Sequence, residues 1–114
     1  MTEFADVEFD AIVDYAGFGT TTAEAIETVG RGGRVVQVGM GKLEATISTK
    51  AMILSEVTLV GSQGGTKEDI AGVYEYLATG KLEPTITTIG FDDIPDGLDK
   101  LAKGEVVGRL VALY

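Results

Sequence analysis

A strand, a glycine turn, a helix, a second glycine turn and another strand follow one another between residues 9 and 39. The first apolar run ends at Gly17, a helical pattern covers Thr21 to Val29, and Val35 to Val38 is typical of a returning strand. The strands lie about 20 residues apart, and a helical connection of that length brings the second strand back parallel to the first. The sequence therefore predicts a βαβ unit of a nucleotide-binding α/β sheet.

The local pattern also predicts how this unit is built. Residues Ala11 to Val13 are apolar at successive positions, which is typical of a parallel strand that helices cover on both faces. We therefore expect this strand to be buried. Thr21 and Glu24 have the spacing of a capping box at the start of the helix, which we expect to stop at Gly30.

Further elements extend the sheet beyond this unit. Thr49 to Glu56 has the pattern of a short helix, and Val57 to Gly61 that of a third parallel strand. Thr66 and Asp69 form a second candidate capping box, before a helix that we expect to end at Gly80. Its apolar face would hold Ile70, Val73, Tyr74 and Leu77.

The last third of the chain alternates strand, helix and strand. Thr85 to Ile89 and Val106 to Leu113 are the strands, and Asp93 is expected to cap the helix between them, with Pro95 in its first turn and Ile94, Leu98 and Leu101 facing inward. The fold class we predict is α/β. Residues 1–62 would form the second half of a Rossmann-type parallel sheet (βαβαβ), and residues 63–114 an α+β carboxy-terminal segment.

The first half of such a fold has no counterpart in the sequence. A dinucleotide site of this type needs G-x-G-x-x-G at the start of a helix and an acidic residue about 20 residues later. The three candidates have another residue at the third glycine position: Thr22 after Gly17-Phe18-Gly19, Val35 after Gly30-Arg31-Gly32, and Glu44 after Gly39-Met40-Gly41. We therefore expect a piece of an enzyme, either truncated or naturally short.

Composition excludes several classes of function. The 114 residues are 45% hydrophobic, which fits one modest globular domain, and 18 acidic against 9 basic side chains give a net charge of −9. That charge repels nucleic acid and anionic membranes. The apolar runs are far shorter than the roughly 20 residues of a membrane helix. We expect a soluble, cytoplasmic protein.

Candidates for catalysis and metal binding fail for chemical reasons. The chain has no cysteine and no histidine, and its acidic residues show no spaced calcium-type cluster, so we expect no bound metal. Asp92 and Asp93 are better explained as helix caps, and Asp14 as an acceptor for loop amides. The tyrosines lack the Tyr-x-x-x-Lys pair of short-chain dehydrogenases. We therefore predict no catalytic residue in this chain.

Several short motifs together carry a resemblance that covers nearly the whole chain. They are Phe9-Asp10-x-x-x-Asp14-x-x-Gly17, Gly32-Gly33-Arg34-Val35-Val36-x-Val38-Gly39, Thr58-Leu59-x-Gly61-Ser62, Gly80-Lys81-Leu82-x-Pro84 and Gly108-Arg109-x-Val111. In their order and spacing they resemble the carboxy-terminal part of a medium-chain dehydrogenase of the zinc-containing alcohol dehydrogenase superfamily. The family's zinc ligands, glycine fingerprint and ribose-binding acid would lie upstream of this sequence.

The resemblance implies which residues contact a cofactor. The loop after the first strand would pass beside the adenosine and the nicotinamide ribose of NAD or NADP, and the loops after the next two strands would approach the nicotinamide. Arg109 would reach the pyrophosphate, for which a guanidinium fork is suited. The alternatives are plain strand-to-helix turns and a solvated arginine on an edge strand. The cofactor-binding candidates are Tyr15, Ala16, Gly17, Val38, Gly39, Met40, Ser62, Gln63 and Arg109.

The function implied is hydride transfer between a nicotinamide cofactor and an alcohol or carbonyl compound, with zinc in the zinc-containing branch of the family. We expect the fragment to be inactive alone. A zinc-free quinone oxidoreductase is an alternative, although that branch tends to end in Gly-Lys where this chain has Gly108-Arg109. Another alternative is a non-catalytic module that forms a homo-oligomer, such as a dimer, through the edge strand Val57 to Val60.

Overall fold

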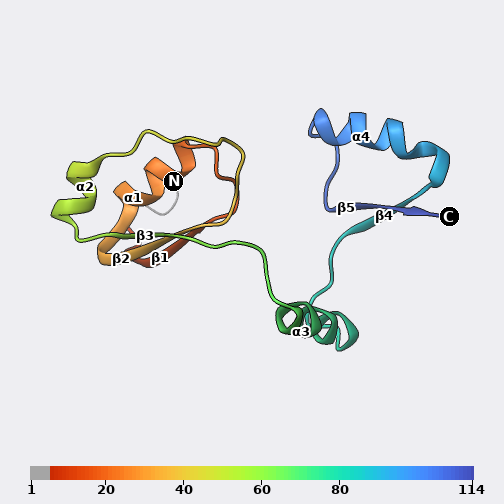
Figure 1. Cartoon of the computed structure of the whole chain (residues 1–114), viewed down its shortest axis with the longest axis horizontal. Coiled ribbons are helices and arrows are strands. Elements are labelled where there is room, and N and C mark those ends of the chain that lie inside the picture. Colours follow the sequence, from red (N-terminus) through yellow and green to blue (C-terminus); the bar gives the residue numbers. More distant parts are fainter. Residues whose placement is uncertain (1–5) are drawn as a thin grey trace. The chain divides into compact units, whose positions relative to one another are not determined.

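The computed structural model describes residues 6–114, which divide into two compact units (Figure 1). The first unit ends at Gly64, and the second covers Gly65–Tyr114. In each unit a helix joins parallel strands, so the predicted α/β class is confirmed. No helix within residues 6–114 has both the length and the apolar character needed to span a membrane.

The first unit is a three-stranded parallel sheet with two helices. Its elements, in chain order, are β1 (Phe9–Asp14), α1 (Thr20–Thr28), β2 (Val29–Gln37), α2 (Thr49–Leu54) and β3 (Thr58–Gly61). The spatial order is β1-β2-β3, with β2 in the centre and both neighbours parallel to it. The predicted succession of three parallel strands is confirmed.

One face of this sheet carries the hydrophobic core. Ile12, Val35 and Leu59 are adjacent in register across the three strands. Ala25 and Ile26 of α1 are almost completely buried in the same cluster, which α2 joins through half-buried apolar side chains. Figure 1 shows both helices over the same side of the strands.

The opposite face of the sheet is open in the described part of the chain. Val13, Val36 and Val60 form the next row in register, and Val13 is 45% and Val60 41% exposed. The expectation that the first strand is buried on both faces is therefore wrong. Successive side chains of a strand point to opposite faces, and only the Ile12 side of β1 meets the helices.

Two boundaries near α1 also differ from the prediction. The helix begins at Thr20, with Gly19 as its N-cap and no side-chain cap hydrogen bond, so the expected capping box at Thr21 is wrong. The strand β2 starts at Val29, directly after the helix, and the glycine-rich segment predicted as a turn belongs to this strand. An irregularity in the β1–β2 register absorbs the extra residues, and the Gly32 amide donates to the carbonyl of Ser55 at 2.8 Å.

The second unit contains a two-stranded parallel sheet. Its elements are α3 (Lys67–Ala78), β4 (Ile86–Gly90), the 3-10 turn η2 (Phe91–Asp93), α4 (Ile94–Ala102) and β5 (Arg109–Leu113). β4 pairs with β5 along their full length. Gly97 brings α4 close to the sheet, where it is buried against Ile89 and Leu110. The predicted strand–helix–strand order is confirmed.

Caps and exposure in the second unit agree only partly with the sequence pattern. The Thr66–Asp69 capping box is present. Asp93 occupies the N-cap position of α4 as expected, but it makes no side-chain cap hydrogen bond there, because its carboxylate accepts from the Gly90 amide at 3.1 Å and closes η2. Leu98 and Leu101 line a cavity of about 200 Å³ beneath α4, yet they stay 60% and 48% exposed. The apolar face of α3 is exposed in the described part of the chain.

Candidate functional site

The three strands of the first unit end in one row. Asp14, Gln37 and Gly61, the last residues of β1, β2 and β3, are adjacent in register. Ligands of open α/β sheets bind at the carboxyl ends of parallel strands. Eight of the nine predicted cofactor residues lie in the loops that follow this row.

The loops after β1 and β2 are joined by backbone hydrogen bonds. The amides of Val38 and Gly39 donate to the Asp14 carbonyl at 3.0 and 2.9 Å. Further along, the Gly41 amide donates to Ala16 at 3.1 Å and the Lys42 amide to Gly17 at 2.8 Å. The two loops thus form one continuous surface.

Close packing explains the glycines in these loops. Gly17 has φ +63°, and a Cβ atom there would overlap the carbonyl group of Gly39. A Cβ atom on Gly39 would overlap the backbone of Tyr15 and Ala16. Glycine is therefore required at both positions by the fold of the loops themselves.

Asp14 is the anchor of the first loop. Its side chain is 6% exposed, and its carboxylate accepts from the amides of Gly17 at 2.9 Å and Ala16 at 3.0 Å. The hydroxyls of Thr21 and Thr22 donate to the same carboxylate. Burial raises the pKa of Asp14, but the hydrogen bonds, led by the Gly17 amide, outweigh it and lower the pKa overall. The expected role as an acceptor for loop amides is confirmed.

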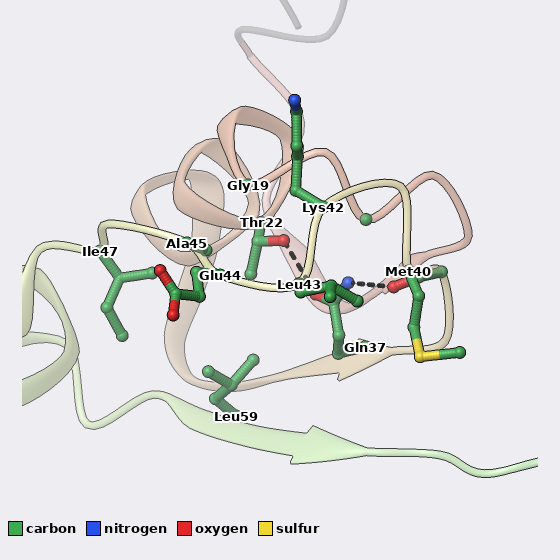
Figure 2. A pocket seen from close by; sticks show the side chains of 12 residues that line it. Gly19, Thr22, Gln37, Met40, Lys42, Leu43, Glu44, Ala45, Ile47 and Leu59 are labelled. Atoms are coloured by element: carbon green, nitrogen blue, oxygen red, sulfur yellow. Dashed lines mark hydrogen bonds between the residues drawn. The ribbon is translucent and has the colours of Figure 1, made fainter.

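Gln37 connects α1 with the loops after β2 and β3, a role that sequence reasoning missed. Its Oε1 accepts from the Thr22 hydroxyl at 2.9 Å, its Nε2 donates to the Gly39 carbonyl at 2.8 Å, and its own carbonyl accepts from the Ser62 amide at 2.9 Å. Figure 2 draws both side-chain bonds. The available signal was one amide side chain in the otherwise apolar run Val35 to Val38.

Two cavities open beside these loops. One, of about 460 Å³, brings Val38, Gly39 and Met40 together with Ser62 and Gln63. The other, of about 300 Å³, lies beneath the segment from Met40 to Ile47. In Figure 2 this segment passes over Leu59 of β3, while the Lys42 side chain points away from that residue.

Arg109 belongs to the other unit. It is the first residue of β5, and its exposed guanidinium donates to the carbonyl of Gly108 at 3.3 Å. The structure thus brings together the eight loop residues of the first unit, while Arg109 is placed only within the second unit.

The donor set of the described residues does not fit a zinc ion. Residues 6–114 contain no group of three or more histidine, cysteine or acidic side chains that could hold a metal. Zinc sites in proteins are built mainly from cysteine and histidine, and this chain has neither.

Comparison with known proteins confirms the resemblance. The sequence matches the family model of zinc-binding dehydrogenases over residues 1–111, and the chain belongs to this family. An alcohol dehydrogenase of Geobacillus stearothermophilus is 31% identical over 88 residues, which is 77% of this chain and 26% of that enzyme.

Solved structures of dehydrogenases and reductases also superpose on this chain. Acetophenone reductase from Geotrichum candidum, in complex with NAD, superposes with a TM-score of 0.86 at 30% identity, over 92% of this chain and 31% of that one. An alcohol dehydrogenase from Aeropyrum pernix superposes with a TM-score of 0.84 at 30% identity, over 94% of this chain and 31% of that one. This chain therefore spans less than a third of the length of these three relatives.

Proposed function

We propose that the loops after β1, β2 and β3 bind the nicotinamide half of NAD or NADP, as part of an alcohol dehydrogenase-like oxidoreductase. The observation that carries this proposal is the hydrogen-bonded surface at the carboxyl ends of three parallel strands, beside a cavity of about 460 Å³. The NAD complex of the acetophenone reductase, a 30% identical relative, supports the same cofactor class.

The proposed roles are binding and orientation. Tyr15 to Gly17 and Val38 to Met40 would offer backbone groups to the ribose and nicotinamide, and Ser62 and Gln63 would face the carboxamide. Arg109 would bind the pyrophosphate with its guanidinium fork. The bound nicotinamide supplies the hydride donor or acceptor for an alcohol or carbonyl substrate. Any zinc that polarises the substrate oxygen would depend on residues outside this chain.

An NADH titration, followed by nicotinamide fluorescence, tests this function. We expect saturable binding that weakens about tenfold in Arg109→Ala, because a charge-assisted phosphate contact is lost. Arg34→Ala is the matched control, since Arg34 is also exposed and stands on β2, outside the proposed contacts. Equal affinities in all three proteins would refute the phosphate role of Arg109. A folded chain that does not bind NADH would refute a cofactor site in the isolated chain.

We also propose that β3 mediates self-association in the cytoplasm. The observation behind this second function is that, within residues 6–114, β3 pairs with β2 on one side only and carries the partly exposed Val60. Light scattering of the intact chain should show a homo-oligomer that Val60→Lys dissociates. Val13→Lys, on the same sheet face but on β1, is the control. A monomer, or equal dissociation by both variants, would contradict assembly through β3.

A further inference from the structure

Gln37 stands at the centre of the row of strand ends. It is the last residue of the central strand, with Asp14 and Gly61 as its register partners on either side. Its side chain is half-buried and bridges α1 and the loop after β2, through Thr22 on one side and the Gly39 carbonyl on the other. A side chain in this position can set the placement of the loop after β2 relative to α1.

The chemistry of its neighbours fixes which way the amide of Gln37 points. A backbone carbonyl oxygen only accepts hydrogen bonds, so the NH₂ group must face Gly39 and the carbonyl oxygen must face Thr22. The Thr22 hydroxyl can donate in that direction. The Gly39 carbonyl, which can only accept, therefore holds the Gln37 amide in one orientation.

The side-chain amide of Gln37 fixes the orientation of one backbone peptide, the one between Gly39 and Met40. The Gly39 amide is already bound to the Asp14 carbonyl, and the Gly39 carbonyl is bound by Gln37. The peptide between Gly39 and Met40 is trans and planar, so the Met40 N–H points opposite to the Gly39 carbonyl. Within residues 6–114 that N–H has no hydrogen-bond partner, and Met40 lines both cavities.

The buried hydroxyl of Thr22 contacts the other end of the Gln37 amide. Thr22 is 5% exposed, and its Oγ1 lies 2.9 Å from Gln37 Oε1 and 2.8 Å from Asp14 Oδ2. Its single hydrogen can be given to either acceptor. Thr22 therefore connects Gln37 to the carboxylate that anchors the first loop.

We propose that Gln37 is a positioning residue of the cofactor site. It binds the Gly39 carbonyl and keeps it turned towards the end of β2, and it thereby presents the Met40 N–H, a backbone donor, to the bound ligand. The ligand part of this inference rests on the proposed nicotinamide site. The control of the Gly39–Met40 peptide is a property of the chain without ligand.

Binding of NADH tests the ligand part. Gln37→Leu removes both side-chain hydrogen bonds at nearly the same volume, and we expect NADH to bind about tenfold more weakly. Arg34→Leu also introduces a leucine, at an exposed position of the same strand, and should leave the affinity unchanged. Wild-type affinity in Gln37→Leu would overturn the positioning role.

Gln37→Glu separates positioning from simple packing. An ionised glutamate has the shape of glutamine but cannot donate to the Gly39 carbonyl, whereas a protonated one can. The titratable neighbours are Asp14 on β1 and Lys42 and Glu44 beyond β2. We expect calorimetry with acid-stable NAD⁺ to show weak binding at about pH 8 that recovers, relative to the wild type at each pH, only as the pH falls towards about 4, where a glutamate becomes protonated. A pH-independent ratio would contradict the proposal.

Amide hydrogen exchange tests the role of Gln37 in holding the loop after β2 without any cofactor. In Gln37→Leu, we expect the amides of Gly39, Gly41 and Lys42 to exchange about tenfold faster, because the loop that carries their hydrogen bonds is released. The amide of Val35 in the core should not change. If the wild type fails to bind NADH, the proposed function falls, while this measurement still tests the role of Gln37. Unchanged exchange at these three amides would overturn it.

Discussion

The carbonyl oxygen of Gly39 packs against Gly17 so closely that a Cβ atom at Gly17 would overlap it. The same hypothetical atom would lie 2.8 Å from Nε2 of Gln37, the group that binds this carbonyl. Two loops that follow different strands are therefore fitted together at one point. Any side chain at Gly17 must push the two loops apart.

We expect Gly17→Ala to lower the free energy of unfolding by about 2–4 kcal/mol, from the positive φ and the clash with backbone atoms. Urea unfolding of the whole chain measures this change. The control is Gly61→Ala, because a Cβ atom there meets nothing within 4 Å. Equal stability of the two variants would show that the loops can separate without loss.

Asp14 should make stability depend on pH in the acid range. Its pKa is lowered in the folded chain, so the unfolded chain binds a proton at higher pH than the folded one. The stabilisation is complete above the unfolded value of about 3.9 and is lost as the pH falls through the lowered pKa.

Asp14→Asn should therefore unfold more easily than the wild type at pH 7, by about 1–3 kcal/mol, because charge-assisted bonds become neutral ones. Urea unfolding at several pH values should show this difference shrinking below about pH 4. Asp69, whose pKa is also lowered, titrates alike in both proteins and cancels in the comparison. A difference that stays constant down to the lowest pH would contradict this account of Asp14.

The order of helices and strands could be predicted because its signals are local. The apolar run before Gly17 and the cap residues Thr66 and Asp69 act on their own segments, and the structure has these elements where the sequence indicated them. Glycine-rich segments were harder to predict. The stretch at Gly32 looks like a turn, but it joins β2 because Ser55, distant in sequence, accepts its amide hydrogen bond.

Side-chain roles in the site depended on distant partners. The exposure of Val13 follows from which face the helices cover, and no local pattern records that choice. The role of Gln37 exists only because the fold brings Thr22 and Gly39 to either end of its amide. The family resemblance indicated the loops, whereas the hydrogen bonds that shape them required the structure.

The capping box of α3 offers a clean test in the second unit. Thr66 Oγ1 accepts from the Asp69 amide at 3.2 Å, and Asp69 Oδ2 accepts from the Thr66 amide at 2.7 Å. Thr66→Ala should destabilise α3 by about 1 kcal/mol and speed amide exchange in its first turns. Thr66→Ser keeps the hydroxyl and should restore protection. Identical exchange in both variants would mean that the hydroxyl does not stabilise this helix.

Gly97 is the point at which α4 meets the sheet of the second unit. A Cβ atom there would lie 3.1 Å from the terminal methyl of Ile89 and 3.3 Å from that of Leu110. Both neighbours are ends of flexible side chains beside a cavity of about 200 Å³, so they can move by a few tenths of an ångström. Alanine also improves helix propensity by about 1 kcal/mol over glycine.

We therefore expect Gly97→Ala to leave the unfolding free energy within about 0.5 kcal/mol of the wild type, since the helix gain offsets the tight contact. Gly97→Leu places a full side chain between α4 and the strands and should destabilise the unit by about 1–3 kcal/mol. Gly72→Leu on α3 is the matched control, because a Cβ atom at Gly72 meets nothing within 4 Å. Amide exchange of β4 and β5 locates the effect, which should be confined to Gly97→Leu. Equal exchange in the two leucine variants would show that α4 can move off the sheet without loss, and the close approach at Gly97 would then contribute nothing to the stability of this unit.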